Sequence, residues 1–427
     1  MDSSKTAARS LLDQSNTHFD LTNPEHQVSL LSLADKLLCF EDMPLSDLLQ
    51  ISENYDAPLE FELAVKLVQS RREILSITQP ASIAVVFAMW GEHNRLLAKD
   101  EENPNGEDSL RTKIAQLEWI TRDSLVDWHL YAVDDGCPHE SADIAQRIVD
   151  GLDEHLSKRV SVLELSKALP TTQGPLRNLT SADDSRKGGA IIYGCMQALN
   201  DGADAVVYTD ADNSVHLGQL GTIVGPFCKH AKQVVLGNRK HPDSILVKQE
   251  ERWGVGIKTL RHMQRMIGAQ IFDNGIKDTQ AAFKLYGREV LSKILQNPTV
   301  FDFSFDTDWI YAAMELKQSI ATVPFAFIDS AAESASIVQG PMTTWYVLIE
   351  GLVKAAEARN AEYSEEMANV FKSEIKSYHD LELIIDVLPP ELADAEDKEL
   401  GNPTIMSPNS VRQWIKEAKE SNEQATA

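Results

Sequence analysis

The chain has 427 residues, which is enough for one large α/β domain with appendages or for two or three smaller domains. Its hydrophobic content of 43% and charged content of 25% are ordinary for a soluble globular protein. The formal net charge of −25 argues against nucleic acid as the main partner, because a phosphate backbone attracts basic surfaces.

The cysteines and the lengths of the apolar runs indicate the cellular location of the protein. The four cysteines are widely spaced and form no CxxC pair, which favours reduced thiols over a zinc site or a disulfide framework. The N-terminus lacks the apolar core of a signal peptide, and no run of about 18 apolar residues is present. We therefore expect a soluble, cytoplasmic protein.

Residues 1–78 are expected to form a helical N-terminal extension. Residues 1–26 are polar and are expected to be loose. From 27 to 76 the apolar residues recur at helical spacing, as in "FELAVKLVQSRREIL" (61–75).

Strand-like and helix-like segments alternate after Pro80. The expected strands are 82–90, 126–136, 160–165, 204–212 and 233–239. The expected helices between them are 111–124, 141–152, 188–202 and 217–228. This alternation predicts an α/β domain over 79–335 with a mainly parallel sheet and helices on both faces. Residues 336–427 are expected to form an acidic helical C-terminal region.

Charged clusters follow four of these strands. They are "WGE" (90–92), "DDG" (134–136), "DAD" (210–212) and "NRK" (238–240). Because open α/β sheets bind ligands beyond the carboxyl ends of their strands, we expect the four clusters to converge there. Trp90 has two interpretations, stacking on a base or ordinary core packing.

Asp210 and Asp212 are the first candidates for chemistry. Side chains at i and i+2 of an extended segment point the same way, so the two carboxylates repel one another. A solvated turn is the alternative explanation. A divalent cation, with substrate phosphates completing its shell, relieves the repulsion, and the buried run before the pair favours this metal site. His216 is expected on the surface at a helix start, with a place near the metal as the alternative.

Two further segments carry candidate residues. In "SRKGGAIIYGCMQAL" (185–199), two glycines before an apolar helix let the backbone approach an anion, and Lys187 adds positive charge. A plain helix start is the alternative. In "FDTDW" (305–309), Asp306 and Asp308 precede an apolar helix, where acids also serve as helix caps.

Together these segments resemble the family 2 glycosyltransferases with the GT-A fold. The matching motifs are "FAMWGEHNRL", "AVDDGCPHES", "SRKGGAIIYGCMQAL", "VVYTDADNS", "VVLGNRK", "IKDTQAAFKLYGREVL" and "FDFSFDTDWI". The resemblance runs from about residue 82 to 330 and is strongest to the dolichyl-phosphate glucosyl- and mannosyltransferases and their bacterial relatives. It implies a Rossmann-like, mainly parallel sheet flanked by helices.

The resemblance also implies roles for individual residues. The implied donor-binding residues are Glu92, Asp135, Lys187, Gly188, Asp210, Arg239 and Arg252. Glu92 and Asp135 would contact the nucleoside. Asp210 and Asp212 would hold Mg²⁺ or Mn²⁺ against the diphosphate, where the metal stabilises charge on the leaving group.

The acceptor side is implied to involve Asp278 and the Asp306/Asp308 element. A hydroxyl acceptor needs a carboxylate to take its proton, and Asp278 is the first candidate, with Asp308 second. A phosphate acceptor needs no strong base.

The implied activity is inverting, metal-dependent transfer of a hexosyl group from a nucleotide-diphosphate sugar, with UDP-glucose or GDP-mannose as the donor. Gly91, where the family usually has Asn, keeps open a non-catalytic nucleotide-sugar-binding protein. Ala281 and Ala282 stand where the subgroup has Cys-Gly. A sugar-phosphate nucleotidyltransferase is disfavoured, because the first strand does not end in a Gly-rich loop with Arg.

The partners are expected to be small molecules. Polyprenyl-phosphate enzymes generally carry a membrane anchor, and the lack of one here favours a soluble hydroxyl or phosphate acceptor over a lipid. The helical flanks are candidates for a homodimer interface or for walls of the acceptor pocket.

Overall fold

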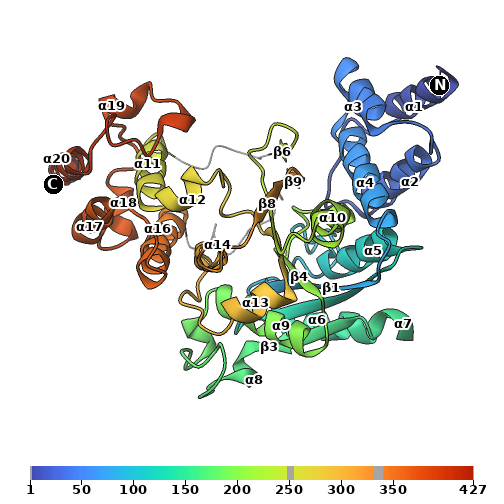
Figure 1. Ribbon diagram of the computed structural model, residues 1–427, viewed down its shortest axis with the longest axis horizontal. Coiled ribbons are helices and arrows are strands. Elements are labelled where there is room, and N and C mark those ends of the chain that lie inside the picture. Colours follow the sequence, from blue (N-terminus) through green and yellow to red (C-terminus); the bar gives the residue numbers. More distant parts are fainter. Residues whose placement is uncertain (1, 248–253, 330–339, 427) are drawn as a thin grey trace. The chain divides into compact units, whose positions relative to one another are not determined.

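The computed structural model describes residues 2–247, 254–329 and 340–426 (Figure 1). The chain forms two compact units, each assembled from separate segments. The first, the sheet unit, comprises Met1–Gln249, Ala281–Gln296 and Gln318–Ala332. The second, the helical unit, comprises Glu250–Gln280, Asn297–Lys317 and Glu333–Ala427.

The sheet unit is built on a mainly parallel sheet. In the described part of the chain this sheet has seven strands in the order β3-β2-β1-β4-β7-β5-β8, and only β7 runs antiparallel to its neighbours. The strands are β1 (Ala81–Met89), β2 (Val126–Asp134), β3 (Val160–Glu164), β4 (Ala205–Thr209), β5 (Val234–Gly237), β7 (Phe283–Gly287) and β8 (Ile320–Val323). A small parallel pair is formed by β6 (Ile245–Val247) and β9 (Ala326–Ile328). The expected α/β class and mainly parallel sheet are confirmed.

Helices cover both faces of this sheet. The helices of the sheet unit are α1 (Asp2–Asp13), α2 (Pro24–Leu38), α3 (Leu45–Asn54), α4 (Leu59–Leu75), α5 (Ser109–Thr121), α6 (Ser141–Asp150), α7 (Glu154–Ser157), α8 (Leu165–Ala168), α9 (Gly188–Asn200), α10 (Leu220–His230) and α13 (Arg288–Ile294), with short 3-10 turns η1 (Ala182–Asp184) and η2 (Leu217–Gln219).

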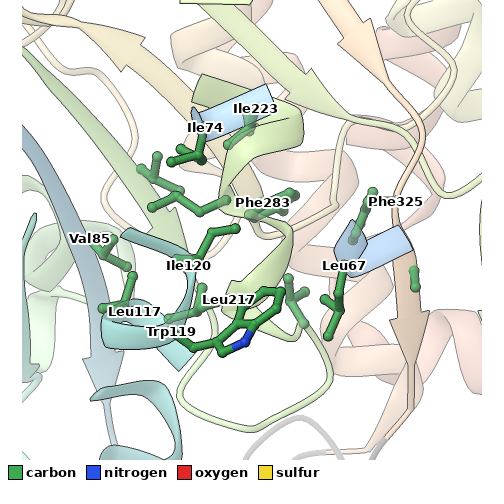
Figure 2. Packing of buried hydrophobic residues seen from close by; sticks show 14 of the residues in the cluster. Leu67, Ile74, Val85, Leu117, Trp119, Ile120, Leu217, Ile223, Phe283 and Phe325 are labelled. Atoms are coloured by element: carbon green, nitrogen blue, oxygen red, sulfur yellow. The ribbon is translucent and has the colours of Figure 1, made fainter. Parts of the chain in front are cut away.

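The alternation of strand side chains separates the two faces. Val85 on β1 joins the main hydrophobic core with residues from α4, α5, α10 and β7, as Figure 2 shows. Val86 points to the other face, where a Cβ on Gly194 of α9 would come within 2.5 Å of its Cγ1. Glycine at 194 therefore lets α9 lie close against β1.

The N-terminal helices are part of the sheet unit. Phe61, Leu63 and Leu67 of α4 are completely buried in the same core as the sheet. Residues 2–13, which were expected to be loose, form α1, because Ala8 and Leu12 lie one turn apart and are both buried. The expected division at residue 78 therefore falls inside one unit.

The helical unit combines segments from before and after residue 335. Its helices are α11 (Ile257–Ile267), α12 (Ala269–Asp273), α14 (Phe305–Glu315), α16 (Pro341–Ala358), α17 (Glu365–Glu374), α18 (Tyr378–Glu382), α19 (Pro390–Ala393) and α20 (Pro408–Thr426), with the 3-10 turn η3 (Asp397–Glu399). Both α11 and α14 pack against α16. The expected boundary at 335 is crossed because these helices bury their apolar faces against one another. Among the described residues, no helix is both long and apolar enough to cross a membrane.

Candidate active site

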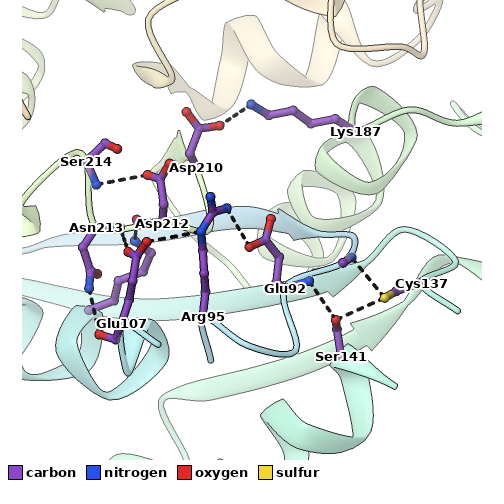
Figure 3. Close-up of polar contacts among 12 residues, drawn as sticks. Glu92, Arg95, Glu107, Cys137, Ser141, Lys187, Asp210, Asp212, Asn213 and Ser214 are labelled. Atoms are coloured by element: carbon purple, nitrogen blue, oxygen red, sulfur yellow. Dashed lines mark hydrogen bonds and ion pairs between the residues drawn. The ribbon is translucent and has the colours of Figure 1, made fainter. Parts of the chain in front are cut away.

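The charged clusters predicted from the strand ends meet at the carboxyl edge of the sheet. Strands β2, β1 and β4 are neighbours, and their parallel registers bring Met89 opposite Asp134 and Phe87 opposite Thr209. Figure 3 shows the resulting group of polar side chains around Asp210 and Asp212. The convergence expected from the sequence is therefore present in the fold.

Asp210 lies beside two cations. One of its oxygens, Oδ1, is ion-paired with Nζ of Lys187, and its side chain remains 32% exposed. Desolvation would raise the pKa of Asp210, but the positive charge of Lys187, assisted by Arg239, holds that pKa below its usual range. Asp210 is thus an ionised carboxylate within reach of solvent.

Asp212 is held by the backbone around it. Its Oδ1 accepts a hydrogen bond of 3.0 Å from the amide of Ser214. Its own carbonyl oxygen accepts a bond from Nζ of Lys113, a side chain on α5 that is completely buried. Burial lowers the pKa of Lys113, and the nearby carboxylates oppose that change.

The donor set of this pair fits a hard divalent cation. Within the described residues, no group of three or more His, Cys, Asp or Glu side chains is arranged to hold a metal. Asp210 and Asp212 offer oxygen ligands only, and their Oδ2 atoms make no hydrogen bond within the part of the chain that is described. Such a pair suits Mg²⁺ or Mn²⁺ when phosphates and water supply the remaining ligands.

Asp135 organises the turn that leads into α9. Its Oδ1 accepts a 2.5 Å bond from Ser185 Oγ, and its Oδ2 accepts a 2.6 Å bond from the amide of Lys187. Lys187 has a left-handed φ of 79°, and Gly188 behind it is buried at the first position of α9. Burial raises the pKa of Asp135 to about 6, against the opposing effect of these two bonds. Both oxygens of Asp135 therefore bind groups of the protein itself, and they hold the backbone turn at Lys187.

A buried chain of ionic contacts connects β1 to the Asp210–Asp212 loop. Glu92 Oε2 pairs with Arg95 at 2.9 Å, and Arg95 Nε lies 3.2 Å from Glu107 Oε1. Glu107 in turn accepts a 2.9 Å bond from the amide of Asn213. Burial raises the pKa of Glu92 to about 7; Arg95 opposes this shift and the charge of Asp212 adds to it.

Arg95, Glu107 and Lys113 were not among the residues predicted from the sequence. The signal for Lys113 is a lysine on an otherwise apolar helix face, between Leu110 and Leu117. Nothing comparable marks Arg95 or Glu107. Glu92 lies only three residues before Arg95, but the contact of Glu107 with Asn213 joins residues 106 positions apart.

One sequence expectation at this edge is wrong, and one open alternative is decided. His216 was expected on the surface, but it is 1% exposed and its Nδ1 accepts a 3.0 Å bond from the amide of Gly218. Burial lowers the pKa of His216 to about 3, so its imidazole is neutral. Trp90 is 37% exposed, which excludes the core-packing alternative.

The remaining donor-side candidates are two arginines. The guanidinium of Arg239 lies over the ring of Phe327, 5.1 Å from its centroid, and its charge acts on Asp210. Arg252 lies outside the described residues.

The acceptor-side candidates belong to the helical unit and have different surroundings. Asp278 is 4% exposed, and its Oδ1 accepts a 3.3 Å bond from the amide of Gln280. Asp306 is also 4% exposed. Asp308 is completely buried: its Oδ1 is 2.7 Å from both Arg359 Nε and Thr299 Oγ1, and its Oδ2 accepts a bond from the Thr299 amide. This environment is that of an internal ion pair and does not favour Asp308 as a base.

Comparison with known proteins now adds to this geometry. The family model of glycosyl transferase family 2 matches residues 107–295. This segment is a family 2 glycosyltransferase domain. The matched segment of this glycosyltransferase contains Asp135, Lys187, the Asp210–Asp212 pair and Arg239, whereas Glu92 precedes it.

One curated relative of this glycosyltransferase is a dolichyl-phosphate beta-glucosyltransferase of Trichomonas vaginalis. It is 23% identical over 294 residues, which cover 66% of this chain and 78% of the relative.

Solved structures of glucosyl-3-phosphoglycerate synthase from Mycobacterium tuberculosis also align with this glycosyltransferase. One, in complex with phosphoglyceric acid, is 14% identical with a TM-score of 0.44. Another, in complex with Mn²⁺, uridine-diphosphate-glucose and phosphoglyceric acid, is 15% identical with a TM-score of 0.44. Both alignments cover 70% of this chain and 85% of the other.

Proposed function

We propose that this glycosyltransferase moves a hexosyl group from UDP-glucose or GDP-mannose to a soluble hydroxyl or phosphate acceptor. The transfer is a single inverting displacement that requires Mg²⁺ or Mn²⁺. The observation that carries the proposal is the Asp210–Asp212 pair at the carboxyl edge of β4, with Lys187 directly beside it. Residues of these types are what a metal-bound diphosphate needs, namely two carboxylates for the cation and an ammonium for the phosphates.

Asp210 and Asp212 would hold the divalent cation, which supplies stabilisation of the negative charge that develops on the departing nucleoside diphosphate. Lys187 contributes to the same stabilisation through its ammonium group. Its backbone amide donates a 2.6 Å bond to Asp135, and this bond fixes the turn that carries the Lys187 side chain. Gly188 at the start of α9 places helix amide groups next to that turn, and these favour an anion.

The exposure of Trp90 supports a nucleoside position beyond β1. Trp90 exposes an indole surface on which a base can stack, and the carboxyl group of Glu92 lies two residues further on. Arg239 adds a positive charge on the side of β5.

Proton removal from a hydroxyl acceptor is assigned to Asp278. Of the two carboxylates considered for this role, Asp308 has both oxygens bonded, to Arg359 and to Thr299. Asp278 accepts a 3.3 Å bond from the amide of Gln280 at its Oδ1. If the acceptor is a phosphate, its oxygen attacks without a strong base.

A second candidate acceptor is a polyprenyl phosphate. The observation that favours it is the 23% identity to a protein described as a dolichyl-phosphate glucosyltransferase. The same donor site serves both acceptors, so the two candidates differ only in what attacks the sugar.

The experiment is a turnover assay on the purified full-length chain. UDP-glucose or GDP-mannose is supplied with Mn²⁺ or Mg²⁺, and release of the nucleoside diphosphate is followed against sugars, small phosphorylated hydroxy acids and dolichyl phosphate in detergent. We expect acceptor-dependent release with one donor, lost in Asp212→Asn. Binding of a donor without release for any acceptor would instead favour a nucleotide-sugar-binding protein.

A further inference from the structure

Lys113 is a buried cation whose position the activity alone does not explain. It sits on α5 among Leu110, Ile114 and Leu117, with no exposed surface. Burying an ammonium group away from water is costly unless it is compensated by hydrogen bonds and opposite charges. A lysine at this position therefore indicates that something around it needs a positive charge.

The groups around Lys113 that need a positive charge are carboxylates and a backbone carbonyl. Its Nζ donates to the carbonyl oxygen of Asp212, and the carboxylates that act on it most strongly are those of Asp212 and Glu107, followed by Asp210 and Glu92. The other buried cation nearby, Arg95, is already paired with Glu92 and Glu107. Lys113 is the cation bonded to the Asp210–Asp212 loop itself from within the core.

The two aspartates create an electrostatic problem whenever no other cation neutralises them. Like charges in one loop repel, and part of that repulsion acts through the protein interior, where solvent screens it poorly. Lys187 offsets the charge of Asp210 at the surface, as Figure 3 shows. Asp212 has no such surface partner in the described contacts, and its backbone is the group that Lys113 holds.

We propose that the ammonium of Lys113 is an internal counter-ion for the Asp210–Asp212 pair, and that Lys113 is a positioning residue for the Asp212 backbone. This inference rests on the proposed function, because it assumes that the pair receives a divalent cation. The ammonium of Lys113 and that cation relieve the same repulsion. Lys113 therefore keeps the loop formed without metal, and it also weakens metal binding, so that the metal can leave with the diphosphate product.

The test compares variants that separate charge from hydrogen bonding. Lys113→Met removes both, Lys113→Gln keeps a hydrogen-bond donor without the charge, and Lys113→Arg keeps the charge. The matched control is Lys66→Met, because Lys66 is also a buried lysine that donates to a backbone carbonyl, that of Asp243, at 2.6 Å. The charged neighbours of Lys66 are Asp243 and Glu62, not the aspartate pair.

The measurement is Mn²⁺ affinity of the full-length chain by titration calorimetry, together with thermal unfolding in EDTA and in Mn²⁺. We expect Lys113→Met and Lys113→Gln to bind Mn²⁺ about tenfold more tightly than wild type, the order expected for removing a unit charge near a divalent ion. Their unfolding temperature should fall in EDTA and rise with Mn²⁺ by roughly twice the wild-type shift. Lys113→Arg and Lys66→Met should bind Mn²⁺ as the wild type does.

Equal or weaker Mn²⁺ binding by Lys113→Gln would overturn the inference while leaving the proposed function intact. If Lys113→Met fails to fold, Lys113→Gln decides the question. If the wild type binds Mn²⁺ no better than Asp212→Asn does, with or without UDP or GDP, the metal site fails and both proposals fall.

Discussion

Asp135 has both carboxylate oxygens bonded within the protein, to Ser185 Oγ and to the amide of Lys187. An asparagine at this position can keep both contacts, because its oxygen can face the Lys187 amide and its amino group the Ser185 hydroxyl. We expect Asp135→Asn to change the free energy of unfolding by less than about 1 kcal/mol, and Asp135→Ala to lower it by about 1–3 kcal/mol. Urea denaturation of the two variants checks this. Equal losses in both would show that the negative charge, and not the hydrogen bonds, holds the turn.

Glu92 predicts a pH dependence of stability. Its pKa is raised from 4.5 to about 7 in the folded protein, so the native state binds the proton more tightly than the unfolded chain does. The contribution of Glu92 to stability should therefore be greatest below about pH 4.5. It should fall as the pH rises to about 7, and the total loss should be up to roughly 3 kcal/mol. Asp135, with its pKa raised to about 6, acts in the same direction.

The variant that checks this is Glu92→Gln, whose side chain does not titrate. Denaturation between pH 4.5 and 7.5 should show a shallower decline of stability in this variant than in the wild type. An unchanged slope would mean that Glu92 is ionised throughout this range.

At the residue scale, the sequence located the groups whose own spacing carries information. The spacing of Asp210 and Asp212 after a buried strand predicted their common position at the sheet edge. Glu107 was missed because its partners, Arg95 and Asn213, become neighbours only when the chain is folded. His216 was placed on the surface for a different reason: the turn η2 that follows it packs against α4 and α5, and this long-range packing buries the imidazole.

Among the elements, the contact between α4 and α10 depends on one glycine. A Cβ on Gly221 would overlap the carbonyl oxygen of Ser70, and the Gly221 amide donates a 2.8 Å bond to Ser70 Oγ. We expect Gly221→Ala to lower the free energy of unfolding by about 1–3 kcal/mol, because the two helices must separate.

The matched control lies one turn later on the same helix. A Cβ on Gly225 would meet the end of the flexible Glu73 side chain at 3.0 Å, and this side chain can move. Gly225→Ala should therefore be neutral or slightly stabilising, since alanine favours helix. If chemical denaturation gave similar losses for both variants, close packing of α4 on α10 would not be the cause.

Element positions and the mainly parallel arrangement of the sheet were largely predictable, and the antiparallel strand β7 was not. The expected strands at 82–90 and 126–136 match β1 and β2 closely, because buried strands produce continuous apolar runs. The sequence of β7 does not indicate its antiparallel direction, since an apolar run predicts a buried strand but not the direction in which that strand pairs. Helix α1 was missed because its apolar stripe is short, with Ala8 and Leu12 as the buried members.

At the scale of the whole molecule, the N-terminal helices contribute to the core of the sheet unit. Phe61, Leu63, Leu67 and Val68 of α4 are completely buried there. Burying such side chains stabilises a protein by about 1.5–3 kcal/mol each, so their sum rivals the total stability of an ordinary domain. We expect a chain of residues 79–427 to lack cooperative thermal unfolding by circular dichroism.

The control is a chain of residues 24–427, which loses α1 and keeps α4. It should still unfold cooperatively, with a modestly lower midpoint. Full retention of the wild-type transition by residues 79–427 would show that the extension is an independent domain.

The organisation into two units was not predictable from local patterns. Residues 250–280 and 297–317 lie within the span that resembles the glycosyltransferase family, yet they group with the C-terminal helices. Their assignment depends on which apolar helix faces pack together, as α11 and α14 do on α16. Helical periodicity predicts that a helix has an apolar face, but it does not predict which element packs against that face.

The central claim is that Asp210 and Asp212 bind a sugar nucleotide through a divalent cation. The most direct measurement is a calorimetric titration of UDP-, GDP- and ADP-sugars into the wild type and Asp212→Asn, with Mn²⁺ and with EDTA. The account predicts that one sugar nucleotide binds the wild type in Mn²⁺, with affinity that falls at least about tenfold in EDTA and in the variant. Equal binding in EDTA and in Mn²⁺, or no binding of any of these donors in Mn²⁺, would contradict it.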